Sequence, residues 1–413
     1  MAKRCVVTGM GFVSSVGTGK DTFWKSLTEG KSGVSHITYF DTSMLPVRIA
    51  GEVKDFKPAD YVDESRLPIT SRSAQFAVGA AKMAVEDAGI LPENTGNSRL
   101  SLIVGTTSPP VDSIEDHINN VWGKESPHLS TRPHDLASIC PHSPTAEVSH
   151  ALGFFDSAST VSTVCTSGSN AIGGGLREIR AGRKDIVLAG ATESTIVFFT
   201  FLTFISAGLL AQNTDVPPEK IMRPFDKKRQ GGVLSEGAAF VVLEELEHAR
   251  LRGAHIYGEI AGYSLQNKTR GLSYIKRGMV NSIREALGDA RMPPSEVDYI
   301  CAHGVSSLIS DKMETLAFKE VFGAHAYRVP VSSIKSMTGI PNSAAGPMEL
   351  GAVLLSFQTD IIPPTINYEN PDPECDLDYV PNTARFNRIN AALLNNHGLD
   401  GANAVLIAKR YGD

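Results

Sequence analysis

The stretch SAQFAVGAAKMAVEDAGILPEN at residues 73–94, followed by RLSLIVGTT at residues 99–107, decides the fold, because the chain uses the same pattern twice. The second copy is MVNSIREALGDARMPPSEV at residues 279–297, followed by DYICAHG at residues 298–304. In each copy an amphipathic helix ends at an Asp-Ala pair, a turn with proline follows, and a short apolar run comes next. Apolar runs without alternation are typical of parallel strands covered by helices on both faces. The sequence therefore predicts a duplicated α/β fold.

Each half is expected to continue with a turn that opens a further helix and to close with a pair of strands. The two turns are the segment around Cys165 and KSMTGIPNSAAGPMELGAVLLSF at residues 335–357. The two predicted strand pairs are GGVLSEGAAFVVLEE at residues 231–245 and INAALLNNHGLDGANAVLIAKR at residues 389–410. The pattern thus repeats beyond its first helix and strand.

We place the seam between the halves near residues 251–255, which gives an N-terminal half of residues 1–251 and a C-terminal half of residues 252–413. The first half carries Cys165, and the second carries His303, Lys335 and the loop around Gly398. Ligand sites of α/β folds lie at strand ends. Two similar halves that face each other would therefore bring Cys165, His303 and the Gly398 loop into one cleft.

Composition limits the classes of function. The 413 residues carry a formal net charge of −6, and no basic run is interleaved with aromatic residues, so nucleic-acid binding has no support. Five cysteines without framework spacing predict reduced thiols and a cytoplasmic location. The N-terminus lacks the apolar core of a signal peptide, and the most apolar run, residues 196–210, is too short to span a bilayer. We expect that run to be a buried segment or a subunit interface, and we expect no membrane contact.

Three patterns that would suggest a bound cofactor or metal do not hold. GMGFVS at residues 9–14 has Ser14 in place of the third glycine of a dinucleotide fingerprint, and VGTGKD at residues 16–21 does not match a P-loop. Three histidines spaced eight residues apart do not have the spacing of a zinc site: His134, His142 and His150. We therefore predict no metal and no permanently bound cofactor.

The run VSTVCTSGSNAIGGGLREIRAG at residues 161–182 contains the strongest candidate for a reactive group. A strand of small and β-branched residues changes there into a helix whose first turn begins at Cys165. Amides at a helix N-terminus favour an anion, so a thiol at that place is expected to shift toward the nucleophilic thiolate. The first hypothesis is an enzyme that forms an acyl thioester on Cys165. The alternative is that Cys165 is a small buried apolar residue.

At the level of whole motifs the chain resembles the β-ketoacyl-acyl-carrier-protein synthases of the elongating type. The resemblance covers nearly the whole chain and rests on VVTGMGFVSSVG (6–17), VCTSGSNAIGGG (164–175), RPFDKKRQGGVLSEGAAFVVLE (223–244), AHGVSS (302–307), SIKSMTGIPNSAAG (333–346) and NNHGLDGANA (395–404). It implies the thiolase-like fold, a duplicated five-layered α/β/α/β/α architecture. It also implies a dimer and substrates carried on the phosphopantetheine arm of an acyl carrier protein.

The resemblance further implies roles for individual residues. Cys165 matches the nucleophile that takes the acyl chain, and the backbone amides of Cys165 and Leu399 would form the oxyanion hole. His303 matches the active-site histidine that helps to orient and decarboxylate the malonyl extender.

Three further residues complete the catalytic set that the resemblance implies. Lys335 matches a buried lysine that, with Glu314 and Glu349, would form one polar network behind the site. A structural role for this network and a catalytic role are both open.

The family's second active-site histidine is missing from this chain. In SIKSMTGIPNSAAG its position is occupied by Ile340, and Pro341 alters the backbone behind it. The family uses two imidazoles to hold the malonyl carbonyl as negative charge develops, and loss of one such donor costs about a hundred- to a thousand-fold in rate. Condensation with malonyl by this chain alone is therefore an open question.

Other departures fall in the same predicted cleft. Val305 replaces a threonine that contacts pantetheine, although Ser307 keeps a hydroxyl at a neighbouring position. In NNHGLDGANA, Leu399 replaces the gating phenylalanine, and Asp400 replaces a glycine and would repel an incoming malonate. His397 takes a position that is normally aromatic and would supply an imidazole from another direction. Ser307, His397, Asp400 and Ile340 are therefore the predicted substrate-binding residues.

Three functions follow from these matches and departures. The first is a β-ketoacyl synthase of fatty-acid or polyketide biosynthesis that loads its acyl chain on Cys165. The second is a non-elongating partner, similar to a chain-length factor, in a heterodimer with a complete synthase. The third is an acyltransferase that uses Cys165 without decarboxylation. The candidates for docking an acidic carrier protein are Arg177, Arg180, Arg183, Lys184, Lys227, Lys228 and Arg229.

Overall fold

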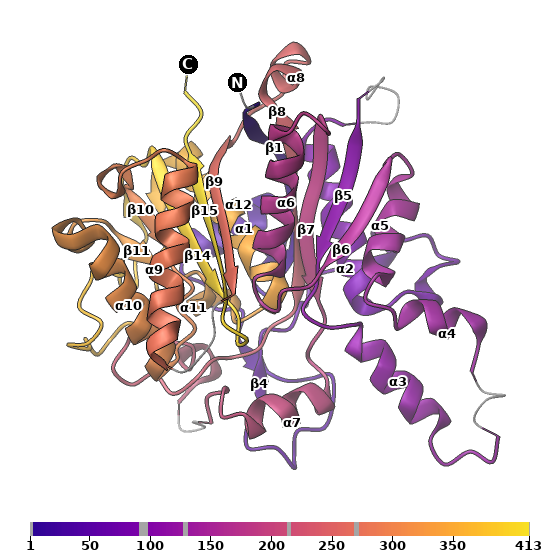
Figure 1. Ribbon diagram of the computed structural model, residues 1–413. Helices are drawn as coiled ribbons and strands as arrows, with labels where there is room; N and C mark the ends of the chain where they lie inside the picture. The colour runs from indigo at the N-terminus through magenta and orange to yellow at the C-terminus, as the bar shows by residue number, and fades with distance from the viewer. Residues whose placement is uncertain (1–2, 91–97, 127–130, 213–215, 268–271, 413) are drawn as a thin grey trace.

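Two sets of five strands, one from each half of the chain, form the centre of the molecule (Figure 1). The computed structural model describes residues 3–90, 98–126, 131–212, 216–267 and 272–412. The first set is β1 (Cys5–Ser14), β5 (Leu100–Gly105), β6 (Ser157–Val161), β7 (Ile186–Glu193) and β8 (Gly237–Glu245). The second set is β9 (Gly258–Asn267), β10 (Tyr299–Cys301), β11 (Val331–Ser332), β14 (Ala391–His397) and β15 (Ala402–Lys409).

The strand order confirms the duplication. Across the sheet the first set runs β1-β8-β7-β5-β6 and the second runs β9-β15-β14-β10-β11. Numbered along the chain within each set, both orders are first, fifth, fourth, second and third. The two sets join where β1 and β9 pair antiparallel at Val6 with Glu259 and at Val7 with Gly258. In both sets the second strand pairs parallel to two neighbours, as the unalternating apolar runs predicted.

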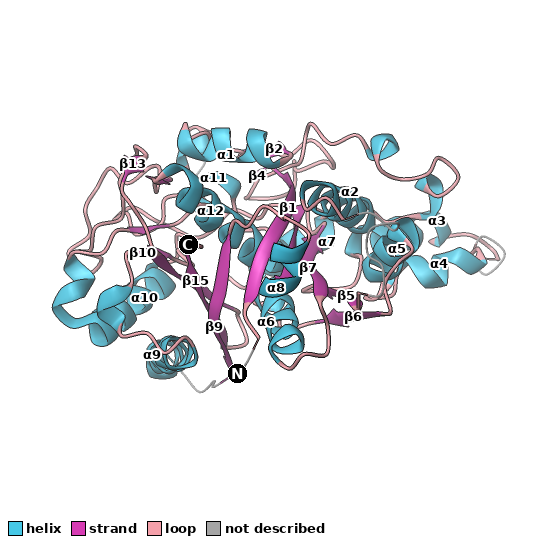
Figure 2. Ribbon diagram, turned by 90° about the horizontal axis from the view of Figure 1, so that it is seen from above, coloured by secondary structure: helices cyan, strands magenta, loops and turns pink. Residues whose placement is uncertain are grey.

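Helices form the other three layers (Figures 1 and 2). Helices α6 (Ser167–Arg180) and α12 (Ala345–Thr359) pack against each other and contact strands of both sets, so they form the central layer. Helices α2 (Arg72–Asp87) and α5 (Ser143–Leu152) cover the outer face of the first set. Helices α9 (Leu272–Asp289) and α10 (Leu308–Phe322) cover the outer face of the second. The arrangement is the predicted five-layered one.

Local sequence explains how these layers approach one another. Helix α12 is apolar around its circumference, as expected of a helix enclosed on both sides, and residues 345–357 are all buried. The glycines of GMGFVS let β1 lie directly on α2, since a Cβ at Gly11 would be 2.1 Å from the carbonyl oxygen of Ala80. This close packing accounts for the glycines that resemble a nucleotide motif.

One predicted strand pair is wrong. Residues 231–245 contain the single strand β8, which pairs with β1 and β7. The preceding residues form isolated bridges to other loops, between Gly232 and Leu210 and between Leu234 and Ile340. They extend a loop beside the candidate active site rather than turning back along β8. The pair predicted at residues 389–410 is correct, because β14 and β15 form an antiparallel hairpin.

The remaining elements are short or peripheral. They are α1 (Lys20–Thr28), α3 (Val111–Val121), α4 (Pro133–Ser138), α7 (Phe198–Ser206), α8 (Leu246–Leu251), α11 (Lys335–Thr338), β2 (Gly17–Thr18), β3 (Ser35–His36), β4 (Ile49–Ala50), β12 (Ile361–Ile362) and β13 (Arg385–Phe386). Within the described part of the chain, no helix combines the length and apolar character needed to cross a bilayer.

Candidate active site

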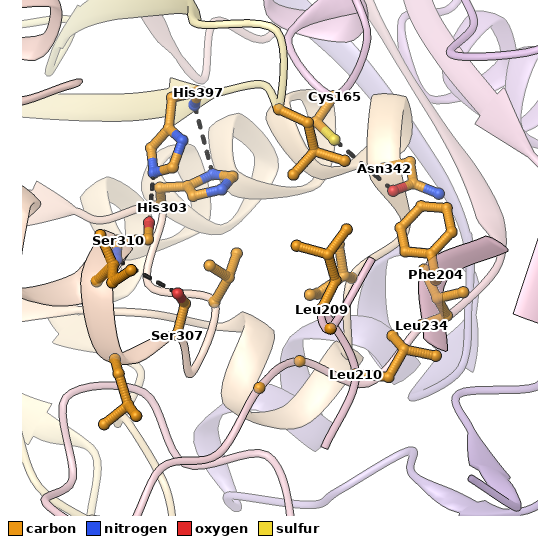
Figure 3. Close-up of a pocket in the computed structure, with 18 of the residues that line it drawn as sticks. Cys165, Phe204, Leu209, Leu210, Leu234, His303, Ser307, Ser310, Asn342 and His397 are labelled. Carbon is orange, nitrogen blue, oxygen red and sulfur yellow. Dashed lines mark hydrogen bonds between the residues drawn. The ribbon is translucent and has the colours of Figure 1, made fainter. Parts of the chain in front are cut away.

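A cavity of about 290 Å³ lies where the loops of both halves meet (Figure 3). Cys165, His303 and His397 lie together on it, so the predicted convergence of the two halves is observed. The rest of its wall is largely apolar. The apolar side chains are Phe204, Leu209, Leu210, Leu234, Val305, Leu308, Ile309, Ile340 and Leu399. This cavity is called the cleft below.

Cys165 lies in the turn that connects β6 to α6, one residue before the helix N-cap Thr166. The residue before it, Val164, has a φ of 52°, a conformation that is unfavourable for a β-branched side chain. Local hydrogen bonds hold the turn, since the Ser167 hydroxyl accepts from the backbone nitrogen of Thr163 at 2.8 Å and donates to the carbonyl of Thr106 at 3.0 Å. The strained turn presents the thiol to the cleft.

The predicted shift of Cys165 toward thiolate is wrong in this structure. Burial and, to a lesser extent, the nearby Glu193 carboxylate raise the pKa of the Cys165 thiol to about 12. The Lys335 ammonium and the backbone amide of Cys165 act in the opposite direction but do not outweigh the loss of water. The same burial raises the pKa of Glu193 to about 7, although hydrogen bonds from Ser343 and Thr107 oppose it. The resting thiol is therefore protonated.

His303 follows β10 at the edge of the cleft and is fixed through its backbone. The Glu314 carboxylate on α10 accepts the backbone N–H of His303 at 2.7 Å and of Gly304 at 2.9 Å, and it also accepts from the amide of Asn395 at 2.6 Å. The ring nitrogen Nδ1 lies 3.4 Å from Oδ1 of Asn396. Burial holds the pKa of His303 well below its usual value, with the neighbouring His397 as a second cause. A neutral imidazole therefore faces the cleft.

The single network predicted for Lys335, Glu314 and Glu349 is two separate ones. Lys335 and Glu349 form a buried ion pair in which each side chain is 1 % exposed, and Glu349 also accepts from the amide of Asn396. Glu314 instead holds backbone amides near His303. Glu314 accepts from the loop after β10 and from Asn395 on β14 rather than from Lys335. The ion pair connects to His303 through Asn396.

His397 brings a second imidazole to the cleft, as the sequence suggested. Its ring centre lies 3.8 Å from that of His303, and its Nε2 is 2.7 Å from the hydroxyl of Ser310 (Figure 3). Burial lowers the pKa of His397 to about 3, and Lys335 contributes to this shift. His397 therefore packs on His303 as a neutral ring tied to Ser310.

The loop after β14 closes the cleft beside the nucleophile. A Cβ at Gly398 would lie 3.7 Å from the backbone nitrogen of Cys165, so the loop passes directly against the turn of the thiol. Leu399 lines the cleft and is 62 % exposed. The carboxylate of Asp400 accepts the backbone N–H of Ala402 at 3.0 Å within its own turn and lies outside the cleft lining.

Ile340 and Ser307, two of the predicted substrate-binding residues, line the cleft, and so does Val305. The Ser307 hydroxyl accepts the backbone N–H of Ser310 at 3.3 Å and so caps α10. The sequence analysis missed Asn342, whose Oδ1 lies 3.7 Å from Sγ of Cys165 and accepts from the thiol. The signal was present in SIKSMTGIPNSAAG, because asparagine after proline favours the left-handed turn that points this side chain inward.

The predicted docking residues separate into paired and available groups. Arg180, Arg183 and Lys184 bind acidic residues of the surface, and Arg177 lies over the ring of Tyr263. Arg229 is buried against Asp372. Lys227 and Lys228, with Arg223, line a second cavity that shares Gln230 and Leu308 with the cleft. Basic groups therefore line a cavity that adjoins the cleft.

Among the described residues, no group of three or more His, Cys, Asp or Glu side chains is arranged to hold a metal ion. The polar groups at the cleft are a thiol, two imidazoles, the side-chain amides of Gln230 and Asn342, and the hydroxyls of Ser307 and Ser310. These groups are suited to nucleophilic chemistry on a carbonyl and to hydrogen bonding of the oxygen on which charge develops.

Comparison with known families and proteins gives the context for this chemistry. The model of the β-ketoacyl synthase N-terminal domain matches residues 2–249, and that of the C-terminal domain matches residues 257–369. The 3-oxoacyl-acyl-carrier-protein synthase 2 of Synechocystis is 37% identical, over 99% of this chain and 98% of its own. The ketoacyl synthase alpha subunit of the tetracenomycin polyketide synthase of Streptomyces glaucescens is 38% identical, over 99% and 97%.

Solved structures agree with the fold over its full length. The ishigamide ketosynthase/chain length factor has a TM-score of 0.92 and 34% identity, with all of both chains covered. A type II polyketide ketosynthase bound to a hexaketide and in complex with its acyl-carrier protein has the same TM-score, identity and coverage. The layered fold described above is thus that of solved ketosynthases.

Proposed function

The chain belongs to the β-ketoacyl synthase family, and we propose that it takes an acyl chain from a carrier-protein thioester onto Cys165 and condenses it with a malonyl extender. The observation that carries this proposal is the meeting of Cys165 with the neutral imidazoles of His303 and His397 on one apolar cleft. A non-elongating subunit needs none of these groups. Their joint presence supports an enzyme.

The first half-reaction is a thioester exchange. The sulfur of Cys165 forms a bond to the acyl carbon, the carrier's thiolate leaves, and the thiol proton of Cys165 ends on that departing sulfur. The backbone amides of Cys165 and Leu399 are the proposed oxyanion hole, which the contact of the Gly398 loop with the nucleophile turn supports. The apolar wall of the cleft suits an acyl chain.

The second half-reaction forms the new carbon–carbon bond. Loss of CO₂ from the malonyl thioester leaves its electron pair as an enolate, and the enolate carbon attacks the Cys165 thioester. The thiolate of Cys165 leaves and is protonated again. His303 is the proposed donor to the enolate oxygen, because its backbone is fixed by Glu314 and its ring is neutral.

The substrates are proposed to arrive on the phosphopantetheine arm of an acyl carrier protein, because one relative is a 3-oxoacyl-acyl-carrier-protein synthase and another is a ketosynthase in complex with its acyl-carrier protein. Lys227 and Lys228 in the cavity that adjoins the cleft would contact its phosphate or the acidic carrier. A second synthase subunit, identical or different, is the other proposed partner. Exposed apolar side chains on helix α7 support a partner subunit, because Phe199 is 64 % exposed and Leu202 is 43 % exposed. The five unpaired cysteines agree with the cytoplasmic location that we propose.

The second candidate function is that of a non-elongating partner similar to a chain-length factor. Ile340 favours it, because an apolar side chain lies where the family places its second imidazole. One relative in the structure comparison is described as a ketosynthase with a chain length factor. An intact and accessible nucleophile is the feature that separates the two candidates.

Intact-protein mass spectrometry after incubation with acyl-carrier thioesters of several chain lengths tests the proposal. We expect an adduct of one acyl group on the unmodified protein and none on Cys165→Ala. Cys140→Ala is the matched control, since Cys140 is the partly exposed cysteine outside the cleft, and it should keep the adduct. An adduct that persists on Cys165→Ala, or no adduct at any chain length, would contradict the proposal.

A further inference from the structure

The turn that should carry the second imidazole is built differently in this chain. It joins α11 to α12, and its residue Ile340 is fixed by two backbone hydrogen bonds, to the carbonyl of Val233 at 2.8 Å and from the N–H of Ser235 at 3.0 Å. The Ile340 side chain packs against Gly232, where a Cβ would lie 2.2 Å from its Cδ1. Position 340 is therefore an anchored apolar wall with no hydrogen-bond donor.

Two residues later, the same turn sends a polar side chain to the nucleophile. Asn342 has a φ of 45°, a conformation that asparagine tolerates better than most residues. Its side chain is 1 % exposed and lies on the cleft, with Oδ1 3.7 Å from Sγ of Cys165 (Figure 3). A buried amide beside a nucleophile is costly unless its groups are hydrogen-bonded. Both groups of the Asn342 amide are hydrogen-bonded here, to Cys165 and to Thr195.

The second partner of Asn342 allows its amide to work in either orientation. Nδ2 donates to the hydroxyl of Thr195 at 3.3 Å, in the segment after β7. A hydroxyl both donates and accepts, so Thr195 bonds equally well to Nδ2 or to Oδ1 of the amide. While the thiol carries its proton, Oδ1 faces Sγ and accepts from it. Once Cys165 is acylated that proton is gone, and the reversed amide presents Nδ2 to the cleft.

His397 is less well placed than Asn342 to replace the missing hydrogen-bond donor. Its Nε2 is already bonded to Ser310, and its ring lies against His303 rather than beside the sulfur. Asn342 contacts the sulfur directly and is independent of His303. His303 and Asn342 lie on the two sides of Cys165 (Figure 3).

We propose that the side-chain amide of Asn342 replaces the family's second imidazole, accepting from the Cys165 thiol before acylation and donating Nδ2–H to the thioester oxygen of the extender as its enolate forms. This inference rests on the proposed condensing function. The electron pair released with CO₂ becomes the enolate, and the amide only donates a hydrogen bond to it, so it neither gains nor loses a proton. Asn342 then acts with His303 on the same oxygen.

The test separates loading from condensation on the full-length protein. Acyl loading is followed by intact mass, and condensation is followed as release of the acyl group from preloaded enzyme on addition of malonyl-carrier thioester. Asn342→Gly removes the amide without straining the left-handed backbone, and Asn342→Asp keeps the shape but cannot donate when ionised. Asn367→Gly is the matched control, because Asn367 is also buried, has a φ of 66° and bonds through Nδ2, but lies away from the cleft.

We expect Asn342→Gly to load its acyl group within about tenfold of the unmodified rate, and to lose about 100- to 1000-fold in condensation, the usual effect of one lost donor. Asn342→Asp should lose condensation as the pH is raised and its carboxyl ionises, and Asn367→Gly should alter neither rate. Condensation by Asn342→Gly at the unmodified rate would overturn the inference, and so would an equal loss in both steps, which would mean that Asn342 only positions the thiol. Failure of the unmodified protein to load would instead refute the proposed function.

Discussion

The Lys335–Glu349 ion pair permits a quantitative prediction, because both side chains are 1 % exposed and the pair connects through Asn396 to His303. Lys335→Met removes the ammonium and leaves the Glu349 carboxylate buried with Asn396 as its remaining partner. Burial already raises the pKa of Glu349, and Lys335 opposes that shift. Without Lys335, we therefore expect the Glu349 side chain to be mainly protonated in the folded protein. Breaking one side of a buried pair costs about 3–5 kcal/mol of stability.

The assay is urea unfolding of Lys335→Met, Glu349→Leu and the double variant. The double variant should lose less unfolding free energy than the sum of the two single losses, by about 2 kcal/mol or more, because it leaves neither buried charge without its partner. Lys220→Met is the matched control, since Lys220 pairs with Glu369 at 2.8 Å but the two side chains are 47 % and 46 % exposed. Loss of that pair should cost under about 1 kcal/mol. A Lys335→Met protein as stable as the control, or strictly additive single losses, would refute the reasoning.

Two further predictions concern buried carboxylates of the candidate site, those of Glu193 and Glu314. Because the thiol pKa is about 12 and the Glu193 carboxylate contributes to that value, the loading rate should rise with pH through neutrality, but ionisation of Glu193 near pH 7 flattens the rise. In Glu193→Gln the flattening should vanish, and loading at pH 8 should be about 3- to 10-fold faster, which corresponds to a thiol pKa lower by about half to one unit. An unchanged pH profile of loading would argue against the coupling between Glu193 and the Cys165 thiol. Glu314→Gln turns an amide donor toward the N–H groups of His303 and Gly304. We therefore expect about 1–3 kcal/mol less stability in urea unfolding and slower condensation. Unchanged stability and an unchanged condensation rate would show that Glu314 does not fix the loop.

The sequence was sufficient for the fold because the duplicated pattern depends on local periodicity. The helix and strand of each copy occur as α2 with β5 and as α9 with β10, and the five layers follow from packing their apolar faces. The strand pair predicted at residues 231–245 was wrong because tertiary bridges, such as that between Leu234 and Ile340, hold the extended residues before β8. That bridge connects residues 106 positions apart in the chain (340 − 234) and leaves no local pattern.

The candidate site was predictable in its residues but not in its electrostatics. Cys165, His303 and His397 meet as expected, since each lies at or shortly after the end of a strand. The protonated state of the thiol was not predictable, because burial outweighs the helix terminus and burial depends on the whole fold. Asn342 was missed because the direction of its side chain depends on its φ of 45° and on Ile340, whose backbone is held by hydrogen bonds to Val233 and Ser235.

The most direct test of the account is a single-turnover reaction of enzyme preloaded with an acyl group on Cys165 and then mixed with malonyl-carrier thioester. We predict that the adduct disappears while CO₂ and a β-ketoacyl-carrier product form in equal amounts. An adduct that persists with no CO₂ release would contradict the central claim that His303 and Asn342 together support condensation without the second imidazole.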